Sequence, residues 1–268
     1  MKKENLSIET LIKLSQDKSE YSRGVAANNP RTPVNILTKL ANDEKKNVRL
    51  GVAQNPNATS NILEKLSNDK DWFIRENVAL NFSISIDTLI KLSNDKDWHV
   101  RACVAKNLKT PSNILVKLSK DKRRNVRVTV AKSIKESIDV FNHLSNDKFD
   151  EVKQAVATNI YTPQNILAKL AKHKYTGIRE AVAENPNTSS DTLSKLSNDE
   201  SWFVREAVAA NPSTPKDILL VLSNDEVWKV REAVVYNTNI TLSILKKLAD
   251  DEGIFIREAA NSKITLLS

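Results

Sequence analysis

Apolar residues recur along the whole chain in pairs of short groups, and the pairs repeat every 26 residues. In the second repeat the groups are Ile36, Leu37 and Leu40, then Val48, Val52 and Ala53. Within each group the spacing of three to four residues places the apolar side chains on one face of a helix. The pattern therefore predicts two short amphipathic helices in every repeat.

Turn residues mark where these helices begin and end. Thr32 can cap the free N–H groups of the first helix, and Pro33 is tolerated at a first helical position. Asn55 tolerates a left-handed turn, and Pro56 cannot continue the second helix. We therefore expect each helix pair to be closed at both ends by the sequence itself.

Arginine and aspartate follow the same period. The arginine column is Arg23, Arg49, Arg75, Arg101, Arg127, Arg179, Arg205, Arg231 and Arg257, with Lys153 at the one remaining point. The aspartate column, six residues earlier, is Asp17, Asp43, Asp69, Asp95, Asp121, Asp147, Asp199, Asp225 and Asp251, with His173 in its gap. Because a strictly periodic charge has the same surroundings in every repeat, we interpret the two columns as an ion ladder between neighbouring repeats.

No insertion or deletion breaks the register. The ten repeats span 6–31, 32–57, 58–83, 84–109, 110–135, 136–161, 162–187, 188–213, 214–239 and 240–265. A helix pair of this length cannot bury its apolar face alone, so neighbouring repeats must stack and share a core. The sequence predicts an all-α fold, an α-solenoid forming one domain over residues 1–268.

One segment carries the pattern most clearly, from Val204-Arg205 through Asn211-Pro212 to Leu219. It resembles the bacterial leucine-rich repeat variant family, a HEAT-like α-solenoid. The resemblance implies a right-handed superhelix of paired short helices, and known members of this repeat class mostly bind other molecules. An iron–sulfur variant of the family needs a cysteine cluster. This chain has only Cys103, so no cofactor is expected, and Cys103 itself is expected to be a small core residue.

Composition narrows the class of protein. The chain is 40 % hydrophobic, which is enough to bury a core and well away from the composition of disordered proteins. It contains no apolar run long enough for a transmembrane helix and no signal-peptide pattern at its start. We expect a soluble cytoplasmic protein that does not bind membranes.

Charge is distributed unevenly. The net charge is +8, but residues 1–135 carry 26 basic and 14 acidic side chains, whereas residues 136–268 carry 15 and 19. Within residues 101–135, nine cations lie outside the arginine column: Lys106, Lys109, Lys117, Lys120, Lys122, Arg123, Arg124, Lys132 and Lys135. Cations gathered on one wall bind phosphates, so this segment predicts an anionic partner such as nucleic acid or an acidic protein.

Four tryptophans share one repeat position, three residues before the arginine: Trp72, Trp98, Trp202 and Trp228. Other repeats have Lys46 or Asp150 there, which indicates a rim rather than a core. Tryptophans at a rim can stack on a base, can anchor a protein partner, or can only cover the loop between the helices. We assign Trp72 and Trp98 to the candidate anion-binding surface and Trp202 and Trp228 to a candidate protein-binding rim.

Positions two before, one after and five after the arginine share one face of the second helix. If that face is concave, Lys106 and Lys132 make it basic in repeats 4 and 5, whereas Glu180, Glu206 and Glu232 make it acidic in repeats 7 to 9. Binding of one uniform duplex along the whole groove is therefore not expected. A short nucleic-acid segment, or a partner of matching polarity, fits better.

No catalytic, cofactor-binding or metal-binding residues are predicted. The three histidines, His99, His143 and His173, lie in different repeats at different positions, and no glycine-rich phosphate loop is present. We keep three hypotheses. The first is a non-enzymatic scaffold that binds an anionic partner, and the second is a protein–protein adaptor that uses the tryptophan rim and the acidic wall. The third is an enzyme like the HEAT-like alkylpurine DNA glycosylases, which are also basic α-solenoids with tryptophans.

Two local departures remain. Lys153 and His173 interrupt the ladder in consecutive repeats, which indicates a bend, a weak point or simple drift of one repeat. At the end of the chain, the apolar residues are Ile254, Ile256, Ile264, Leu266 and Leu267. Because the ends of solenoids usually need polar caps, these residues predict self-association through the C-terminal end.

Overall fold

The computed structural model describes residues 6–267, which form twenty helices and, within that range, no strand. Helices of repeats 1 to 5 are α1 (Ile8–Ser15), α2 (Glu20–Asn28), α3 (Val34–Leu40), α4 (Lys46–Gln54), α5 (Ser60–Leu66), α6 (Trp72–Leu80), α7 (Ile86–Leu92), α8 (Trp98–Lys106), α9 (Ser112–Leu118) and α10 (Arg124–Ser133). Helices of repeats 6 to 10 are α11 (Ile138–Leu144), α12 (Asp150–Thr158), α13 (Gln164–Leu170), α14 (Thr176–Glu184), α15 (Ser190–Leu196), α16 (Trp202–Ala210), α17 (Lys216–Leu222), α18 (Trp228–Tyr236), α19 (Leu242–Leu248) and α20 (Ile254–Leu267). Each repeat has the two helices that the apolar pattern predicts.

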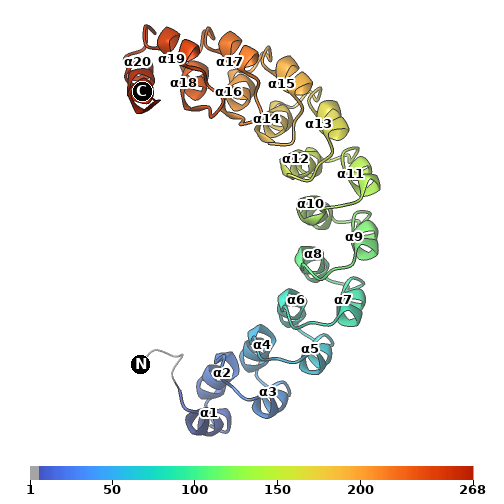
Figure 1. The fold of residues 1–268 in the computed structure, drawn as a ribbon. Helices are drawn as coiled ribbons and strands as arrows, with labels where there is room; N and C mark the ends of the chain where they lie inside the picture. The colour runs from blue at the N-terminus through green and yellow to red at the C-terminus, as the bar shows by residue number, and fades with distance from the viewer. Residues whose placement is uncertain (1–5, 268) are drawn as a thin grey trace. The chain divides into compact units, whose positions relative to one another are not determined.

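The chain divides into two compact units, residues 1–133 and residues 134–268, here called the N-terminal and the C-terminal unit. In each unit, consecutive even-numbered helices pack directly on one another and form the inner layer on the concave side of that unit, with the odd-numbered helices in an outer layer (Figure 1). The organisation as one domain stays a prediction.

Apolar columns fill the space between the two layers. The outer helices contribute side chains such as Leu37 and Leu63, and the inner helices contribute Val52 and Val78, all with no exposed surface. Burial of one such side chain stabilises the fold by about 1.5 to 3 kcal/mol. The same core positions recur in every repeat, so the stability of each unit is a sum over stacked neighbours.

Two turn residues act differently from the sequence prediction. Thr32 lies outside the helix that follows, and its buried hydroxyl donates to the carbonyl of Ala26 at 2.6 Å instead of capping α3. Asn55 adopts an extended conformation (φ −70°), so the left-handed turn was wrong. Its side-chain amide donates to the carbonyls of Ala27 and Asn29 in the preceding repeat, at 2.7 and 2.8 Å. Asn55 therefore connects two repeats.

Repeat 6 begins with backbone strain. Ser137 has a φ of 112°, the only positive φ of a non-glycine residue in the described chain. Its hydroxyl accepts a hydrogen bond from the N–H of Val140 at 3.4 Å and so caps α11. A residue such as serine reaches this left-handed region at a cost of about 1 to 3 kcal/mol. Repeats 2, 5, 7 and 9 begin with Thr-Pro at the positions where repeat 6 has Glu136-Ser137.

Candidate functional site

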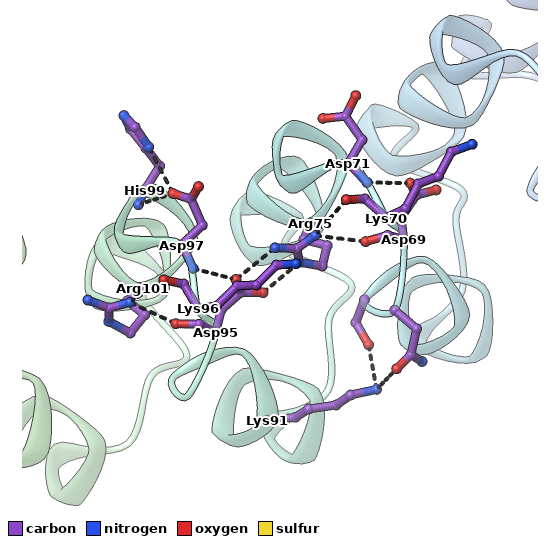
Figure 2. A network of polar contacts seen from close by, with 12 residues as sticks. Asp69, Lys70, Asp71, Arg75, Lys91, Asp95, Lys96, Asp97, His99 and Arg101 are labelled. Carbon is purple, nitrogen blue, oxygen red and sulfur yellow. Dashed lines mark hydrogen bonds and ion pairs between the residues drawn. The ribbon is translucent and has the colours of Figure 1, made fainter.

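The arginine column forms an ion ladder, best seen at Arg75 (Figure 2). Its Nε and Nη2 atoms donate to the two carboxylate oxygens of Asp95 in the next repeat, at 2.6 and 2.8 Å. Its Nη1 atom donates to the carbonyls of Asp69 and Lys70 in its own loop, at 2.8 and 3.4 Å. Both charged side chains are only 7 % exposed. The guanidinium thus fixes one loop and joins it to the next repeat.

The same clamp recurs with Nε–carboxylate distances of 2.5 to 2.7 Å in both units. The pairs are Arg23–Asp43, Arg49–Asp69, Arg101–Asp121, Arg179–Asp199, Arg205–Asp225 and Arg231–Asp251. The interpretation as a structural ladder is confirmed. These arginines are occupied and do not form a binding array.

The interruption of the ladder in repeats 6 and 7 is filled by other polar groups. The ammonium of Lys153 lies 2.8 Å from a carboxylate oxygen of Asp150 and 3.2 Å from Nε2 of His173. Nδ1 of His173 accepts a hydrogen bond from the backbone N–H of Tyr175 at 3.1 Å. The ladder aspartates likewise accept a hydrogen bond from the backbone N–H two residues later, as Asp69 does from Asp71. The junction therefore keeps a polar contact without a guanidinium–carboxylate pair, and the bend or weak point stays a prediction.

This junction should lose stability in mild acid. Burial and then the ammonium of Lys153 lower the pKa of His173 below its ordinary value of 6.5, although Asp150 opposes the shift and Lys174 and Arg179 add to it. A lowered folded-state pKa means that the unfolded chain binds more protons below pH 6.5. Stability is then complete above that pH and falls as the pH drops through the folded-state pKa. Urea titrations at neutral pH and at about pH 5.5 test this. Between the two pH values, the urea concentration at the unfolding midpoint should fall further for the wild type than for His173→Asp. Equal losses would contradict the assignment.

Two tryptophans of the N-terminal unit enclose a histidine. Trp72 and Trp98 are the first residues of α6 and α8, which pack side by side. The ring of His99 lies between them, with centroid distances of 4.5 Å to Trp72 and 3.7 Å to Trp98 and interplanar angles of 24° and 30°. Phe73 meets Trp72 edge-on at 5.7 Å. We call these four rings the aromatic stack.

Asp97 fixes the histidine within the aromatic stack. Its carboxylate accepts from the backbone N–H of His99 at 3.0 Å and contacts ring atom Nδ1 at 2.9 Å (Figure 2). Burial raises the pKa of Asp97, but these contacts with His99 outweigh it and the pKa is lowered. An ionised carboxylate therefore holds the ring in place from one side. His99 was not among the residues predicted from the sequence for this site. Its place directly after Trp98 was the available signal.

The C-terminal unit has the same arrangement with a different occupant. Lys229 stands at the repeat position of His99, and its ammonium lies 5.0 Å from the ring centre of Trp202 and 5.9 Å from that of Trp228. Phe203 stacks on Trp202 with a centroid distance of 3.8 Å. In both units, then, the residue after the second tryptophan fills the space between the two indoles.

The cations of residues 101–135 do not converge on one wall. Lys120, Lys122, Arg123 and Arg124 lie in or next to the loop that leads into α10, and this loop edge is also where α6 and α8 begin with their tryptophans. Lys132 lies eight residues further along α10, about 12 Å away at 1.5 Å per residue. We call the first group the basic loop.

The remaining candidates lie at the far end of the inner helices. Lys106 is the last residue of α8 and Lys109 lies in the loop that follows it. The sequence-based set that joined Lys106, Lys109 and Lys132 with Trp72 and Trp98 is thus divided between two edges of the N-terminal unit. The reason is that α8 and α10 run from one edge to the other.

Some of the nine cations have structural partners. Lys117 donates to Ser93 and Asn94 of the preceding repeat at 3.1 and 2.6 Å, as Lys91 does one repeat earlier. Lys109 donates to the carbonyl of Ile84 at 3.4 Å. In contrast, within the described chain no ion pair involves Lys106, Lys120, Lys122, Arg123 or Lys132, and all five are exposed.

The inner face of the C-terminal unit is acidic, as the helical spacing predicts. Glu180, Glu206 and Glu232 follow one another on α14, α16 and α18 and are half-buried. Burial and then the charge of Glu180 raise the pKa of Glu184. Exposed aromatic rings border this column, among them Phe203 (48 % exposed).

Cys103 is not an activated nucleophile. Burial and the neighbouring carboxylate of Glu76, whose Oε1 lies 3.4 Å from Sγ, raise the pKa of the thiol to about 12. A catalytic cysteine needs the opposite shift. Among the described residues, no group of His, Cys, Asp or Glu could hold a metal ion, and no helix is long and apolar enough to cross a membrane.

The C-terminal end differs in part from the sequence prediction. Ile254 and Leu266 are exposed (55 % and 83 %), and Ile264 is half-buried. Ile256 is 1 % exposed because it packs in the core, so it does not contribute to a sticky surface. The side chain of Leu267 lies outside the described residues. Self-association stays a prediction.

Comparisons with known proteins agree with this architecture. Residues 176–201 and 202–227 match the family model of the leucine rich repeat variant, and residues 86–110 match that of the HEAT repeat. No curated protein matches the chain. A solved structure described as a leucine-rich repeat variant with a novel repetitive structural motif is similar over 82 % of this chain and 87 % of its own, with 25 % identity and a TM-score of 0.60.

Two further structures cover more of the chain at lower similarity. The Escherichia coli protein YibA covers 93 % of this chain and 98 % of its own, with 17 % identity and a TM-score of 0.48. An engineered protein covers 95 % and 97 %, with 15 % identity and a TM-score of 0.41. Stacked helical repeats present extended surfaces of the kind that binding and structural scaffolds use. The resemblance seen in the sequence is confirmed, since two repeats match the leucine rich repeat variant model and the fold is the α-solenoid that this resemblance implied.

Proposed function

We propose that the chain is a non-enzymatic binding scaffold whose N-terminal unit binds an anionic polymer through the basic loop. One observation supports this most directly. The only carboxylate of the loop, Asp121, is held by Nε and Nη2 of Arg101 at 2.6 and 2.9 Å. Lys120, Lys122 and Arg123 are therefore left without a neutralising partner on a short exposed segment.

The arrangement favours a short contact. Repeats 3 and 4 have Asp71 and Asp97 at the same loop edge, at the position where repeat 5 has Arg123. Positive charge is therefore concentrated in repeat 5 and does not run along the whole edge. A partner that contacts about three phosphates should show a log–log salt slope near −2, which corresponds to about a 20-fold loss of affinity between about 50 and 200 mM salt.

The test is fluorescence anisotropy with a labelled single-stranded oligonucleotide of about a dozen residues, a length within the usual site sizes. Lys122→Glu/Arg123→Glu should reduce affinity at least about tenfold and flatten the salt slope by about 1.4, the share of two of the three contacts. The matched control is Lys216→Glu/Lys246→Glu, two exposed lysines of the C-terminal unit, which should change little. Absence of binding at low salt, or binding that survives the first reversal, would remove the proposal. Release of bases from alkylated DNA in an abasic-site assay would overturn the non-enzymatic assignment.

A second candidate function is a protein adaptor that uses the C-terminal unit. It is favoured by the acidic column that contains Glu206 and Glu232. The exposed rings of Phe203 and Tyr236 (65 % exposed) lie beside this column. On the corresponding face, the N-terminal unit has Lys106 and Lys132. Such a face suits a basic protein segment. Binding of an arginine-rich peptide that Glu206→Lys/Glu232→Lys abolishes would support the adaptor, and unchanged binding would argue against it.

A further inference from the structure

We propose that the anionic polymer is a single-stranded nucleic acid, whose unpaired bases stack on the aromatic stack of repeats 3 and 4 while its phosphates contact the basic loop of repeat 5. The proposal rests on the anion binding proposed above and adds the chemistry of the partner. Two elements at one edge carry it, namely partly exposed aromatic rings and the cations Lys120, Lys122 and Arg123, which form no ion pair within the described residues.

The aromatic stack has the right form for bases. Three of its rings, Trp72, His99 and Trp98, lie 3.7 to 4.5 Å apart between neighbouring centroids and within 30° of parallel, so they form a preformed column of planar groups. Trp72 is 37 % exposed and the side chain of His99 is 38 % exposed, so the column reaches solvent. Base stacking on such rings accepts any sequence, because every base has a planar face.

The two parts of the surface are adjacent. Trp72, Trp98 and Arg124 each begin an inner helix, and α6, α8 and α10 pack in that order. Inner helices that pack side by side have axes about 8 to 10 Å apart. A strand that crosses from repeat 3 to repeat 5 is therefore required to extend only about 20 Å.

Charge sets the orientation of the strand. The ionised carboxylate of Asp97 borders the stack and would repel a phosphate placed there. Phosphates are favoured one repeat further along, beside Lys122 and Arg123. A strand whose bases lie over repeats 3 and 4 and whose backbone passes to repeat 5 keeps its phosphates away from Asp97 and close to Lys122 and Arg123.

A duplex does not fit the same surface. Its bases are already stacked on one another, so the ring faces of Trp72 and Trp98 would gain nothing from it. The positive charge of this edge is also concentrated in repeat 5, because Asp71 and Asp97 offset Lys70 and Lys96 in the two preceding loops. We therefore expect a clear preference for single strands.

The C-terminal unit offers an internal control. There the flexible side chain of Lys229, and not a planar ring, lies between Trp202 and Trp228, so no column of parallel rings joins the two indoles. The neighbouring loops carry Glu200 and Glu226, which are 86 % and 87 % exposed and would repel phosphates. The same tryptophan column is thus unsuited to nucleic acid five repeats later.

The experiment compares a single-stranded oligonucleotide with an abasic oligonucleotide of equal length, which has the same phosphates and no bases. The wild type should bind the base-bearing strand about 5- to 150-fold more tightly, the range that one stacked base gives. Trp98→Leu should remove this preference and leave binding of the abasic strand unchanged. Trp228→Leu, the matched variant in the C-terminal unit, should keep the preference. Thermal melting of both variants checks that each remains folded.

The outcomes separate the two proposals. If neither strand binds at low salt, the anion-binding proposal itself fails. If both strands bind equally and Lys122→Glu/Arg123→Glu abolishes both, anion binding stands and the base-stacking inference is wrong. Equal binding of poly-glutamate and the base-bearing strand, insensitive to Trp98→Leu, would indicate an acidic protein partner and would likewise overturn the inference.

Discussion

Replacing Asp69 by alanine is expected to lower the free energy of unfolding by about 3 to 5 kcal/mol, the cost of leaving a buried charge without its partner. Arg49 is 8 % exposed and donates to the Asp69 carboxylate through Nε and Nη2 at 2.6 and 3.2 Å. Its Nη1 atom stays bound to the carbonyls of Asp43 and Glu44, so the guanidinium cannot turn to water. Urea denaturation followed by circular dichroism measures the loss.

The control for this prediction is Asp87→Ala in the same unit. Asp87 is exposed in the first turn of α7 and makes only a favourable contact with the helix dipole, worth about 0.3 to 1 kcal/mol. Losses of similar size for the two variants would show that the ladder contributes no more than a surface charge does.

Acid should weaken the ladder in a predictable direction. Burial raises the pKa of Asp69, but the hydrogen bonds from Arg49 outweigh it and the pKa is lowered from 3.8. The pKa values of Asp43 and Asp251 are lowered as well. A lowered folded-state pKa means that the contribution is present above the unfolded-state pKa and is lost as the pH falls through the folded-state value. Asp69→Asn should therefore show a smaller loss of stability below about pH 4 than the wild type.

Period and register could be predicted from the sequence because they depend on contacts within one repeat. Leucine and valine positions are fixed by helical spacing, and the structure has two helices at each predicted place. Contacts between repeats were harder to assign. Asn55 occupies a helix end in the sequence, yet its side chain binds carbonyls 26 and 28 residues earlier. A periodic polar column does not by itself reveal whether it serves its own loop or the neighbouring repeat.

The candidate site shows the same limit. The clustering of cations near residue 122 was visible in the sequence, but not their division between two edges. Lys117 could have been set aside, because Lys65, Lys91 and Lys169 stand at the same repeat position and a periodic lysine indicates a structural role. The position of His99 between two tryptophans depends on how neighbouring inner helices pack, which spacing within one helix does not define.

Replacing Phe141 by alanine is expected to cost about 3 to 5 kcal/mol in the C-terminal unit, as deletion of a buried aromatic ring does. Phe141 is 1 % exposed in α11 and stands where nine other repeats have leucine. Phe141→Leu restores that residue and should cost about 1.5 kcal/mol or less, because the core loses little volume. Differential scanning calorimetry and urea titration measure both variants, and equal losses would mean that the ring is not required to fill this core.

The position of Phe141 makes its effect more than local. Repeat 6 already contains the strained Ser137 and the substituted ladder contact of Lys153. Since each repeat of a solenoid is stabilised by its neighbours, a repeat weakened further should uncouple from repeat 7 before the rest of the unit unfolds. Phe141→Ala should therefore convert a single cooperative transition into two, whereas Phe141→Leu should keep one. A single transition for both variants would show that the contacts between repeats 6 and 7 outweigh the lost ring.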